Sequence, residues 1–470
     1  MVGKIRDWII DRFGLRPVYD RLLNRRVPRA HWYSGDGSTM LALLGIQVLT
    51  GAVLALTYSP AADSAYASVV YITDEQPLGW FVRGLHYWSA GALVVMVTFH
   101  LFRQILFGGY KSPREGTWIV GVILFFCILF MGYTGYLLRW DERSIHGIRV
   151  MLHMLMRVPI VGESLVLFAQ GGRDLGPQTL TRLYALHVLV IPLFMFSLVG
   201  FHLYLVVIRG TMTRAEREQP VESAEQQKQL YAEETSSETG GEYFFPVTMI
   251  KTGMMATVVL AATLLLTLTA GPAQLYAEAN LIDSSIPAEE WWFWWLSGLI
   301  AFLPPSIAPW LIVTLPVATF VLLIALPILD RSPFRGVRKR PFWAAFVVVM
   351  VIVILLLTDY RRRSAFMGWP DLDPPPVPVG MQLPSDAERG RHLFATYGCN
   401  SCHPVAGHGR QVAVDFAMLQ GQLSRDKIRQ YILQPPAGVA MPGYEGRLDE
   451  SELVALTEFC HLVQTFPRRP

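Results

Sequence analysis

The fold of this chain is decided by residues 83–103, which read RGLHYWSAGALVVMVTFHLFR. The stretch is apolar over a length that can cross a lipid bilayer, for which about 20 residues of helix suffice. In lipid such a segment must be helical, because a helix satisfies its backbone hydrogen bonds internally. His86 and His100 both lie inside it. Their spacing is close to four helical turns, so both side chains share one face at depths that differ by about 21 Å.

The rest of the sequence also has the composition of a membrane protein. Only 16% of the residues are charged, whereas about a quarter are charged in a soluble protein. The net charge of +3 is too small to indicate a nucleic-acid partner. Seven long apolar runs predict an all-α, polytopic protein with about seven transmembrane helices. The runs are 38–58, 80–107, 117–138, 180–208, 246–270, 306–329 and 342–358.

The distribution of basic residues predicts the orientation. Residues 1–29 contain eight Lys or Arg against three Asp, so the positive-inside rule places the N-terminus in the cytoplasm. The 59–79 loop lacks Lys and Arg and is expected outside, and the 330–341 loop carries five and is expected inside. Three arginines at 361–363, on the outer side, are an exception to the rule. Seven crossings bring the C-terminus outside.

A second pair of histidines, His187 and His202, lies in the 180–208 run, again close to four helical turns apart. A single histidine in such a run is ordinarily a hydrogen-bonded core residue, but four of them in two membrane helices indicate a function. Both runs pass from outside to inside. His86 and His187 are therefore expected near the outer face, and His100 and His202 near the inner face. The hypothesis is two b-type haems, each held by two histidines.

Glycines recur with the same spacing as the first histidine pair. Gly37 and Gly51 lie around the first run, and Gly121 and Gly135 lie in the third. A flat macrocycle between helices needs a close approach of the backbone, which glycine permits; contacts between helices are the alternative explanation. Both runs pass from inside to outside. Gly51 and Gly135 thus match the outer histidines, and Gly37 and Gly121 match the inner ones.

Four arginines near the ends of these spans are candidates for binding haem propionates. Arginine suits carboxylates because its planar fork donates two parallel hydrogen bonds. Anchoring of the helix ends at the membrane surface is the alternative for each of them. The candidates are Arg83, Arg103, Arg114 and Arg182.

Polar and proline-rich segments divide the chain into parts. We expect a di-haem four-helix domain at 1–210, a polar cytoplasmic linker at 211–243, a three-helix domain at 244–360, a proline-rich linker at 361–384 and a small helical domain at 385–470. Proline-rich linkers of this kind are extended.

The last domain contains Cys399-Asn-Ser-Cys402-His403, the attachment sequence of a c-type haem. Each cysteine adds to a vinyl group of the haem, and His403 is the expected proximal iron ligand. In bacteria c-type haem is attached outside the cytoplasm. The motif therefore agrees with the external C-terminus that the seven crossings give.

The sixth ligand of this haem is expected to be Met441, which follows His403 in the sequence Ala440-Met441-Pro442-Gly443-Tyr444. A methionine ligand raises the reduction potential of a c-type haem. Met418 is the alternative ligand. A zinc site that combines the two cysteines of the motif with Cys460 and His461 is the competing hypothesis for the domain.

Several pieces of residues 1–210 resemble cytochrome b6, as does the spacing of His187 and His202. The cytochrome b6 family carries a cysteine near the start of its first span that tethers an extra haem. Residues 32–37 of this chain have none, so no covalent third membrane haem is expected. The pieces that carry the resemblance are Arg83-Gly-Leu-His86-Tyr-Trp, His100-Leu-Phe-Arg103, Pro113-Arg-Glu-Gly-Thr-Trp118 and Thr179-Leu-Thr-Arg182-Leu-Tyr-Ala-Leu-His187.

Residues 243–360 are similar to subunit IV of the b6f complex. The loop Pro287-Ala-Glu-Glu290-Trp291-Trp292 stands in the place of that family's Pro-Glu-Trp-Tyr motif. The resemblance implies that Glu290, with Trp291 beside it, accepts a proton from quinol at an external quinol-oxidising site. A belt of interfacial tryptophans with a solvated glutamate is the alternative. The chain also departs from the family at Arg139-Trp-Asp, where the family has Pro-Trp-Asp.

The resemblance implies the cytochrome b subunit of a quinol:cytochrome c or plastocyanin-type oxidoreductase, fused to a class I-like cytochrome c domain. Such an enzyme moves electrons from membrane quinol through two non-covalent b haems and one covalent c haem, and it translocates protons. Its expected location is the bacterial inner membrane, with the N-terminus cytoplasmic and the c domain periplasmic.

The expected partners are the quinone pool, a soluble or membrane-bound cytochrome c-type acceptor, a second copy of the chain in a homodimer, and a Rieske iron–sulfur protein. The Rieske protein would be a separate subunit, because the chain has no Rieske-type Cys/His motif. Two other functions remain as hypotheses. One is a non-bifurcating di-haem anchor that relays electrons between quinol and a periplasmic partner. The other is a non-enzymatic electron relay.

Overall fold

The computed structural model describes residues 2–467 except 157, 174, 237–239, 279–289, 302–307, 364–373, 379, 398, 402, 409–412, 420, 437–440, 442 and 447. Helices dominate this part of the chain, and its strands are the antiparallel two-residue pair β1 (Arg26–Val27) and β2 (Glu242–Tyr243). The predicted all-α class is confirmed.

The chain divides into two compact units. The first consists of Met1–Leu138, Thr179–Gln274 and Trp310–Val353. The second consists of Arg139–Gln178, Leu275–Pro309 and Ile354–Pro470.

Within the described residues, six helices are long and apolar enough to span a membrane. The helix α15 (Ala308–Leu329) adds a shorter apolar segment, Val313–Leu329, so each of the seven predicted runs contains a helix. The helix that covers the last run extends beyond it through the basic residues at 361–363. The six are α3 (Asp36–Ala55), α5 (Gly79–Leu106), α6 (Glu115–Leu137), α9 to α10 (Pro177–Arg209), η3 to α13 (Phe244–Ala270) and α16 (Pro341–Arg363).

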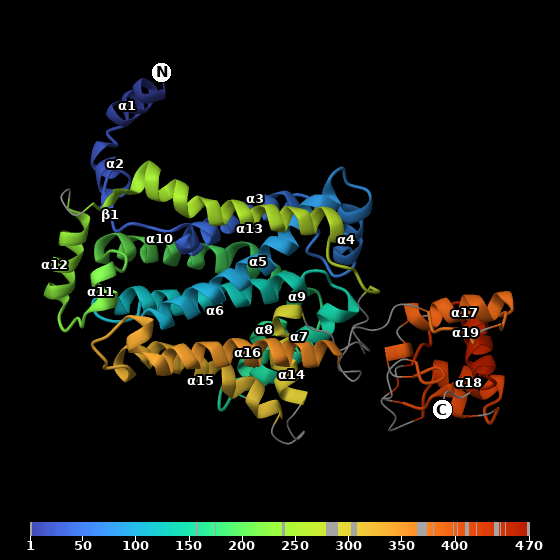
Figure 1. Cartoon of the computed structure of the whole chain (residues 1–470). Helices are drawn as coiled ribbons and strands as arrows, with labels where there is room; N and C mark the ends of the chain where they lie inside the picture. Colours follow the sequence, from blue (N-terminus) through green and yellow to red (C-terminus); the bar gives the residue numbers. More distant parts are fainter. Residues whose placement is uncertain are drawn as a thin grey trace. The chain divides into compact units, whose positions relative to one another are not determined.

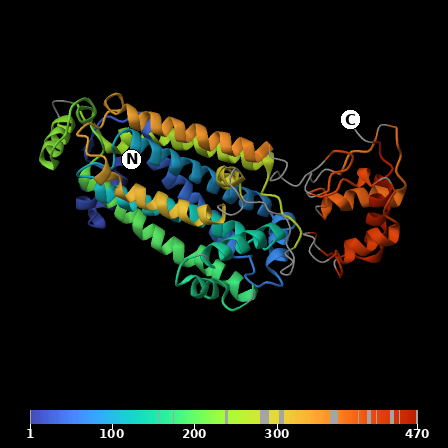
Figure 2. The same cartoon turned by 90° about the horizontal axis from the view of Figure 1, so that it is seen from below.

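In the first unit α3, α5, α6, α10 and α13 run side by side (Figure 1), and Figure 2 shows the same neighbours from below. The helix α5 packs against α3, α6 and α13, and α6 also packs against α10. Close packing requires small residues at the crossings. A Cβ on Gly35 would lie 2.1 Å from the carbonyl oxygen of Thr252, so only glycine fits at that crossing.

A second packing region of the first unit joins α5 and α6 to α15 and α16. Buried Leu101, Ile105 and Trp118 share a hydrophobic cluster with Leu326 and Val347. The indole nitrogen of Trp118 also donates to the carbonyl oxygen of residue 323 at 2.6 Å. Segments from either side of the polar linker are thus packed together within this unit.

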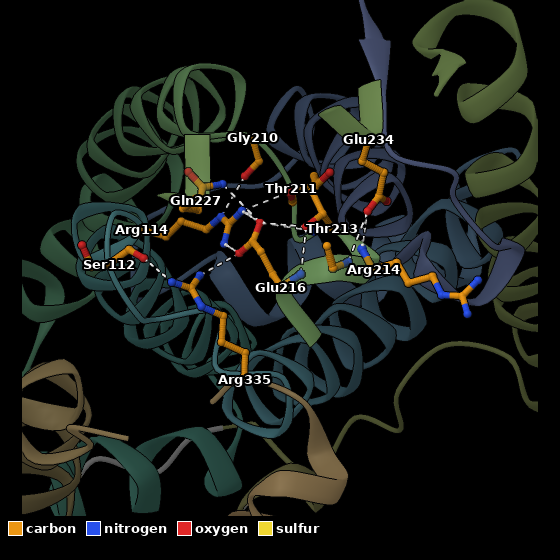
Figure 3. Close-up of polar contacts among 11 residues, drawn as sticks. Ser112, Arg114, Gly210, Thr211, Thr213, Arg214, Glu216, Gln227, Glu234 and Arg335 are labelled. Atoms are coloured by element: carbon orange, nitrogen blue, oxygen red, sulfur yellow. Dashed lines mark hydrogen bonds and ion pairs between the residues drawn. The ribbon is translucent and has the colours of Figure 1, made fainter. Parts of the chain in front are cut away.

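The polar linker is folded rather than extended. It forms α11 (Arg214–Glu218) and α12 (Ala224–Thr235), and Thr213 caps α11 in a reciprocal capping box with Glu216. Glu216 is fully buried between Arg114 and Arg335, each with a nitrogen 2.7 Å from its carboxylate (Figure 3). Burial raises the pKa of Glu216, but hydrogen bonds and charges from both arginines outweigh burial and hold it below the ordinary 4.5.

The second unit contains α7 (Glu142–Met156), α8 (Gly162–Gln170) and α14 (Trp294–Ala301), together with the C-terminal helices. Among the C-terminal helices, α17 (Ser385–Thr396) and α18 (Arg425–Leu433) both pack on α19 (Glu450–Val463). The crossing of α17 and α19 is tight, since a Cβ on Gly390 would lie 2.0 Å from the carbonyl oxygen of Ala455. The shorter elements named below are η2 (Leu186–Val190), η4 (Trp291–Phe293), η6 (Cys399–Ser401) and η7 (Phe416–Met418).

Candidate functional site

His86 of α5 and His187 of η2, the two histidines predicted to lie near the outer face, come together. The ring centroids of His86 and His187 are 6.4 Å apart, and the rings are nearly perpendicular at 77°. Two imidazoles that bind one metal ion from opposite sides would have centroids roughly 6 Å apart, given a metal–nitrogen bond of about 2 Å on each side. The observed separation therefore fits a single six-coordinate iron between the rings.

Hydrogen bonds fix which ring nitrogen of each histidine is available to a metal. The Nδ1 atoms of His86 and His187 lie 2.8 Å from the hydroxyl of Thr50 and 3.0 Å from that of Thr134. Each threonine donates its own hydroxyl proton to a carbonyl of the preceding helical turn. Its oxygen therefore accepts from Nδ1–H of the histidine, which leaves Nε2 with a free lone pair, as a metal ligand requires.

Two of the predicted glycines face these rings directly. A Cβ on Gly51 would lie 3.2 Å from Cε1 of His86, and a Cβ on Gly135 would lie 2.7 Å from Cε1 of His187. Both distances are shorter than ordinary carbon–carbon contacts of about 3.5 Å. The ring of His187 can therefore lie where it does only with glycine at position 135, whereas a Cβ at position 51 would ask the ring of His86 to give by a few tenths of an ångström.

The spacing along the chain differs between His86 and His100 on one helix and His187 and His202 on the other, and the difference has a local explanation. His187 lies in η2, a π-helical turn that sits inside an otherwise α-helical segment. A π turn inserts one extra residue relative to an α-helix. His187 and His202 are separated by one position more than His86 and His100. Because the π turn takes up the extra residue, the two separations cover nearly the same rise along their helices.

His100 and His202, the two histidines predicted to lie near the inner face, have a different environment. His202 on α10 lies within electrostatic range of His100 on α5. A Cβ on Gly121 would lie 3.3 Å from Cε1 of His202, whereas a Cβ on Gly37 would meet no atom of the described residues within 4 Å. Nδ1 of His100 lies 2.6 Å from a carboxylate oxygen of Asp36, a residue that the sequence did not single out.

The four predicted arginines have distinct partners. Arg114 directs its guanidinium at Glu216 and at the carbonyl oxygens of residues 210 and 211, so its described contacts are structural (Figure 3). Arg83 donates to the hydroxyl of Thr73 and to a carbonyl at residue 273. Arg103 binds the carboxylate of Asp36. Arg182 lies on α9, just before the first histidine of that segment.

In the second unit, Glu290 is buried and ion-paired. Only 1% of it is exposed, and its carboxylate lies 3.2 Å from the guanidinium of Arg139. Arg139 also approaches Asp141 at 3.6 Å. Trp291 follows in η4 and is partly buried. Burial argues against the alternative of a solvated glutamate. The neighbouring Glu289, like the start of the loop, lies outside the described residues.

Sequence reasoning missed the role of Arg139 as the partner of this glutamate. A signal was present, because Arg139 replaces the proline that the related family carries at this position. The threonine partners of the histidines carried no such signal, since threonine is common in membrane helices.

In the C-terminal domain, the predicted haem-binding residues that the structure describes are Cys399, His403 and Met441. Nδ1 of His403 donates to the carbonyl oxygen of Val414 at 2.9 Å, which leaves Nε2 available for a metal. Met441 is partly buried, whereas the alternative ligand Met418 is 61% exposed on η7, which favours Met441. Cys402 lies outside the described residues.

The competing zinc hypothesis gains no support from the described part of the chain. There, no group of three or more His, Cys, Asp or Glu side chains is arranged to hold a metal ion. Cys460 belongs to the hydrophobic core of the domain and is 3% exposed. The ring of His461 faces the carbonyl oxygen of Leu423 at 3.3 Å.

Comparison with known proteins points the same way. Residues 24–212 match the family described as cytochrome b/b6/petB. The cytochrome b subunit of menaquinol:cytochrome c reductase from Bacillus subtilis (strain 168) is 36% identical over 219 residues, which is 45% of this chain and 98% of the relative. Cytochrome b6 of Synechococcus elongatus is 38% identical over 194 residues, 41% of this chain and 89% of the relative.

A solved structure extends the likeness beyond the first four spans. A chain of a hyperthermophilic respiratory complex III superposes with a TM-score of 0.65 and 26% identity, over 83% of this chain and 95% of that chain. The curated relatives are matched over nearly their whole lengths. The range that matches the family, residues 24–212, contains all four histidines of the candidate site. The chain is a multi-pass membrane protein that belongs to the cytochrome b/b6 family.

Proposed function

We propose that this protein is the cytochrome b subunit of a quinol:cytochrome c or plastocyanin-type oxidoreductase, with a cytochrome c domain fused at its C-terminus. The observation that carries the proposal is the geometry of His86 and His187, whose separation and tautomer suit one iron. The names of the relatives support it, since one is a subunit of a menaquinol:cytochrome c reductase and another belongs to a respiratory complex III.

The proposal assigns two non-covalent b haems to the first unit. His86 and His187 would bind the outer haem and His100 and His202 the inner one, and bound haem supplies one-electron transfer. The chain's own part is to hold the rings of His86, His187 and His100 by their Nδ1 atoms and to keep glycine at the facing helices. All four candidate arginines stay proposed propionate partners, with Arg114 also engaged by Glu216 and Arg103 by Asp36.

The proposed quinol-oxidising site is the buried carboxylate of Glu290, with Trp291 beside it. A carboxylate in this position can accept a proton from a quinol hydroxyl as the quinol is oxidised. The guanidinium of Arg139, 3.2 Å from the carboxylate, holds Glu290 in place. The buried ion pair is the chain's own departure from the family pattern, and it sets the starting position of the carboxylate.

The proposed covalent haem belongs to residues 385–470. Cys399 and Cys402 would form its thioether links, His403 would be the proximal ligand and Met441 the distal one. The tight pair of α17 and α19 provides a folded scaffold for it.

The proposed assembly follows from the family and from the charge pattern. The protein would lie in a bacterial inner membrane with its N-terminus in the cytoplasm and residues 385–470 in the periplasm. It would form a homodimer and work with a separate Rieske iron–sulfur protein, the quinone pool and a cytochrome c-type acceptor.

Turnover of the purified complex tests the function. We expect quinol-dependent reduction of cytochrome c, inhibition by analogues of quinol at the outer site, and a copurifying Rieske protein. Glu290→Gln should lower turnover by about 100-fold or more, the usual contribution of a proton-accepting side chain. Glu163→Gln, an exposed glutamate of α8, is the matched control.

Unchanged turnover in Glu290→Gln would remove this residue from the quinol site. A complex that lacks a Rieske protein and resists outer-site analogues would instead favour the non-bifurcating anchor. The two outcomes can be told apart, because the first removes only Glu290 from the quinol site, whereas the second replaces the reaction proposed for the whole complex.

A further inference from the structure

One of the four proposed haem ligands has a charged partner. Asp36, the first residue of α3, is fully buried, and its carboxylate oxygen lies 2.6 Å from Nδ1 of His100. Arg103, about one helical turn after His100 on α5, binds the same carboxylate with contacts of 2.8 and 2.9 Å. Asp36 therefore connects the histidine to an arginine across two helices.

The outer site is built differently. There the Nδ1 atoms of both histidines contact threonine hydroxyls, which are neutral. The two proposed haem sites are thus asymmetric in the charge of the group behind the ligand. Thr50 and Asp36 lie on the same helix, α3, and each faces a histidine of α5.

A carboxylate behind a metal-bound histidine has two known effects. It fixes the tautomer and orientation of the ring, and it makes the ligating nitrogen more basic. A charge-assisted hydrogen bond of this kind is about twice as strong as one between neutral groups. A more basic ligand and a nearby negative charge both favour the ferric over the ferrous state of the iron. Arg103 holds the carboxylate in place and offsets part of its charge.

We propose that Asp36 is a positioning residue for the inner haem, which it serves by orienting His100 and by lowering the reduction potential of that haem relative to a site with a neutral partner. The inference rests on the proposed function, in that His100 must ligate a haem. It goes further by assigning to one carboxylate the difference between the two haem environments.

A structural role alone is the competing explanation. Asp36 and Arg103 could simply fasten the start of α3 to the end of α5. Such a fastening would affect assembly and thermal stability, but it would leave the potential of an assembled haem unchanged. The reduction potential is therefore the readout that separates the two roles.

The test is a potentiometric titration of the intact complex, followed by absorbance in the b-haem region, with Asp36→Asn and Asp36→Ser. Serine places at His100 the kind of neutral hydroxyl that threonine supplies at the outer site. In both variants we expect the equilibrium constant for reducing one b haem to rise by tenfold or more, which is about 59 mV for a one-electron couple. The other b haem should be unchanged, and Asp36→Glu should restore much of the original value.

Asp330→Asn is the matched control. Asp330 is another aspartate of the first unit, its side chain is 4% exposed and paired with Lys111 and Arg340, and neither partner is a proposed haem-binding residue. Its substitution should leave both b potentials in place. Equal shifts of both haems in the control and the Asp36 variants would contradict a specific role for Asp36.

Each remaining outcome is also decisive. Two b haems with unshifted potentials in Asp36→Asn and Asp36→Ser would overturn the inference and leave the proposed function intact. Fewer than two b haems in the unmodified complex would overturn the proposed function itself. If no Asp36 variant assembles, electron paramagnetic resonance of the unmodified complex decides, because two identical low-spin b signals would contradict an anionic partner at one site only.

Discussion

Substitution of Gly135 by alanine is predicted to weaken the binding of the proposed outer b haem. A Cβ at this position would lie 2.7 Å from Cε1 of His187 and 3.3 Å from its Nε2. An ordinary carbon–carbon contact is about 3.5 Å, so the ring must retreat by roughly 0.8 Å. Metal–ligand distances tolerate a change of about 0.2 Å. The retreat is several times larger than this tolerance, and the ring is held from behind by Thr134.

The size of the effect follows from the cost of overpacking. Extra methyl groups in a packed interior cost about 1–3 kcal/mol, which corresponds to roughly tenfold to 100-fold weaker retention of the haem. The other glycines provide a graded series. A Cβ would lie 3.2 Å from His86 at Gly51 and 3.3 Å from His202 at Gly121, so those alanine variants should keep most of their haem.

The assay is the b-haem content per chain, measured by pyridine haemochrome and reduced-minus-oxidised spectra. Gly37→Ala separates two causes, because no atom of the described residues lies within 4 Å of a Cβ there. Haem loss in that variant would come from contact with the macrocycle rather than with a histidine. A Gly135→Ala protein with two b haems and unshifted spectra would refute the assignment of His187 and Gly135 to one site.

Three single contacts give the remaining predictions. Thr134→Val removes the acceptor for Nδ1 of its histidine and should weaken outer-haem retention by about 10–100-fold, measured by haem loss to an apoprotein acceptor. Glu216→Gln should cost about 3 kcal/mol of stability at neutral pH, because two arginines lose a buried carboxylate. Since the folded-state pKa of Glu216 lies below 4.5, the difference in melting temperature between the unmodified protein and the variant should shrink as pH falls below 4.5. Gly390→Ala should open the α17–α19 crossing, with protease sensitivity confined to the C-terminal domain and b-haem content unchanged. Full haem retention in Thr134→Val, a pH-independent difference in Glu216→Gln or a protease-resistant C-terminal domain in Gly390→Ala would contradict the corresponding argument.

The sequence was sufficient to predict the helices and that His86 and His187 come together. Apolar length determines a membrane helix, and the constant rise of a helix converts spacing into depth. The π turn at His187 could not be predicted this way, because the two histidine spacings differ by a single position. It is the structure that explains why the longer spacing on one helix matches the shorter spacing on the other.

Contacts between distant segments were beyond the reach of the sequence. The partner of Arg114 is Glu216, which lies 102 residues away in a linker that looked merely polar. Asp36 lies just before an apolar run and has no periodic pattern that links it to His100. The Arg139–Glu290 pair likewise joins two loops that are far apart in the sequence. Such pairs depend on tertiary packing, which neither hydropathy nor spacing encodes.

Two bis-histidine b haems and one covalent c haem are proposed for a single chain. A redox-resolved haem spectrum of the purified protein, combined with a peptide haem stain after denaturation, counts both kinds of haem. We expect two b haems and one stained c haem per chain, with the stain lost when Cys399 or Cys402 is changed and the b signals retained. A single b haem, or a peptide that carries no haem stain, would contradict this proposal.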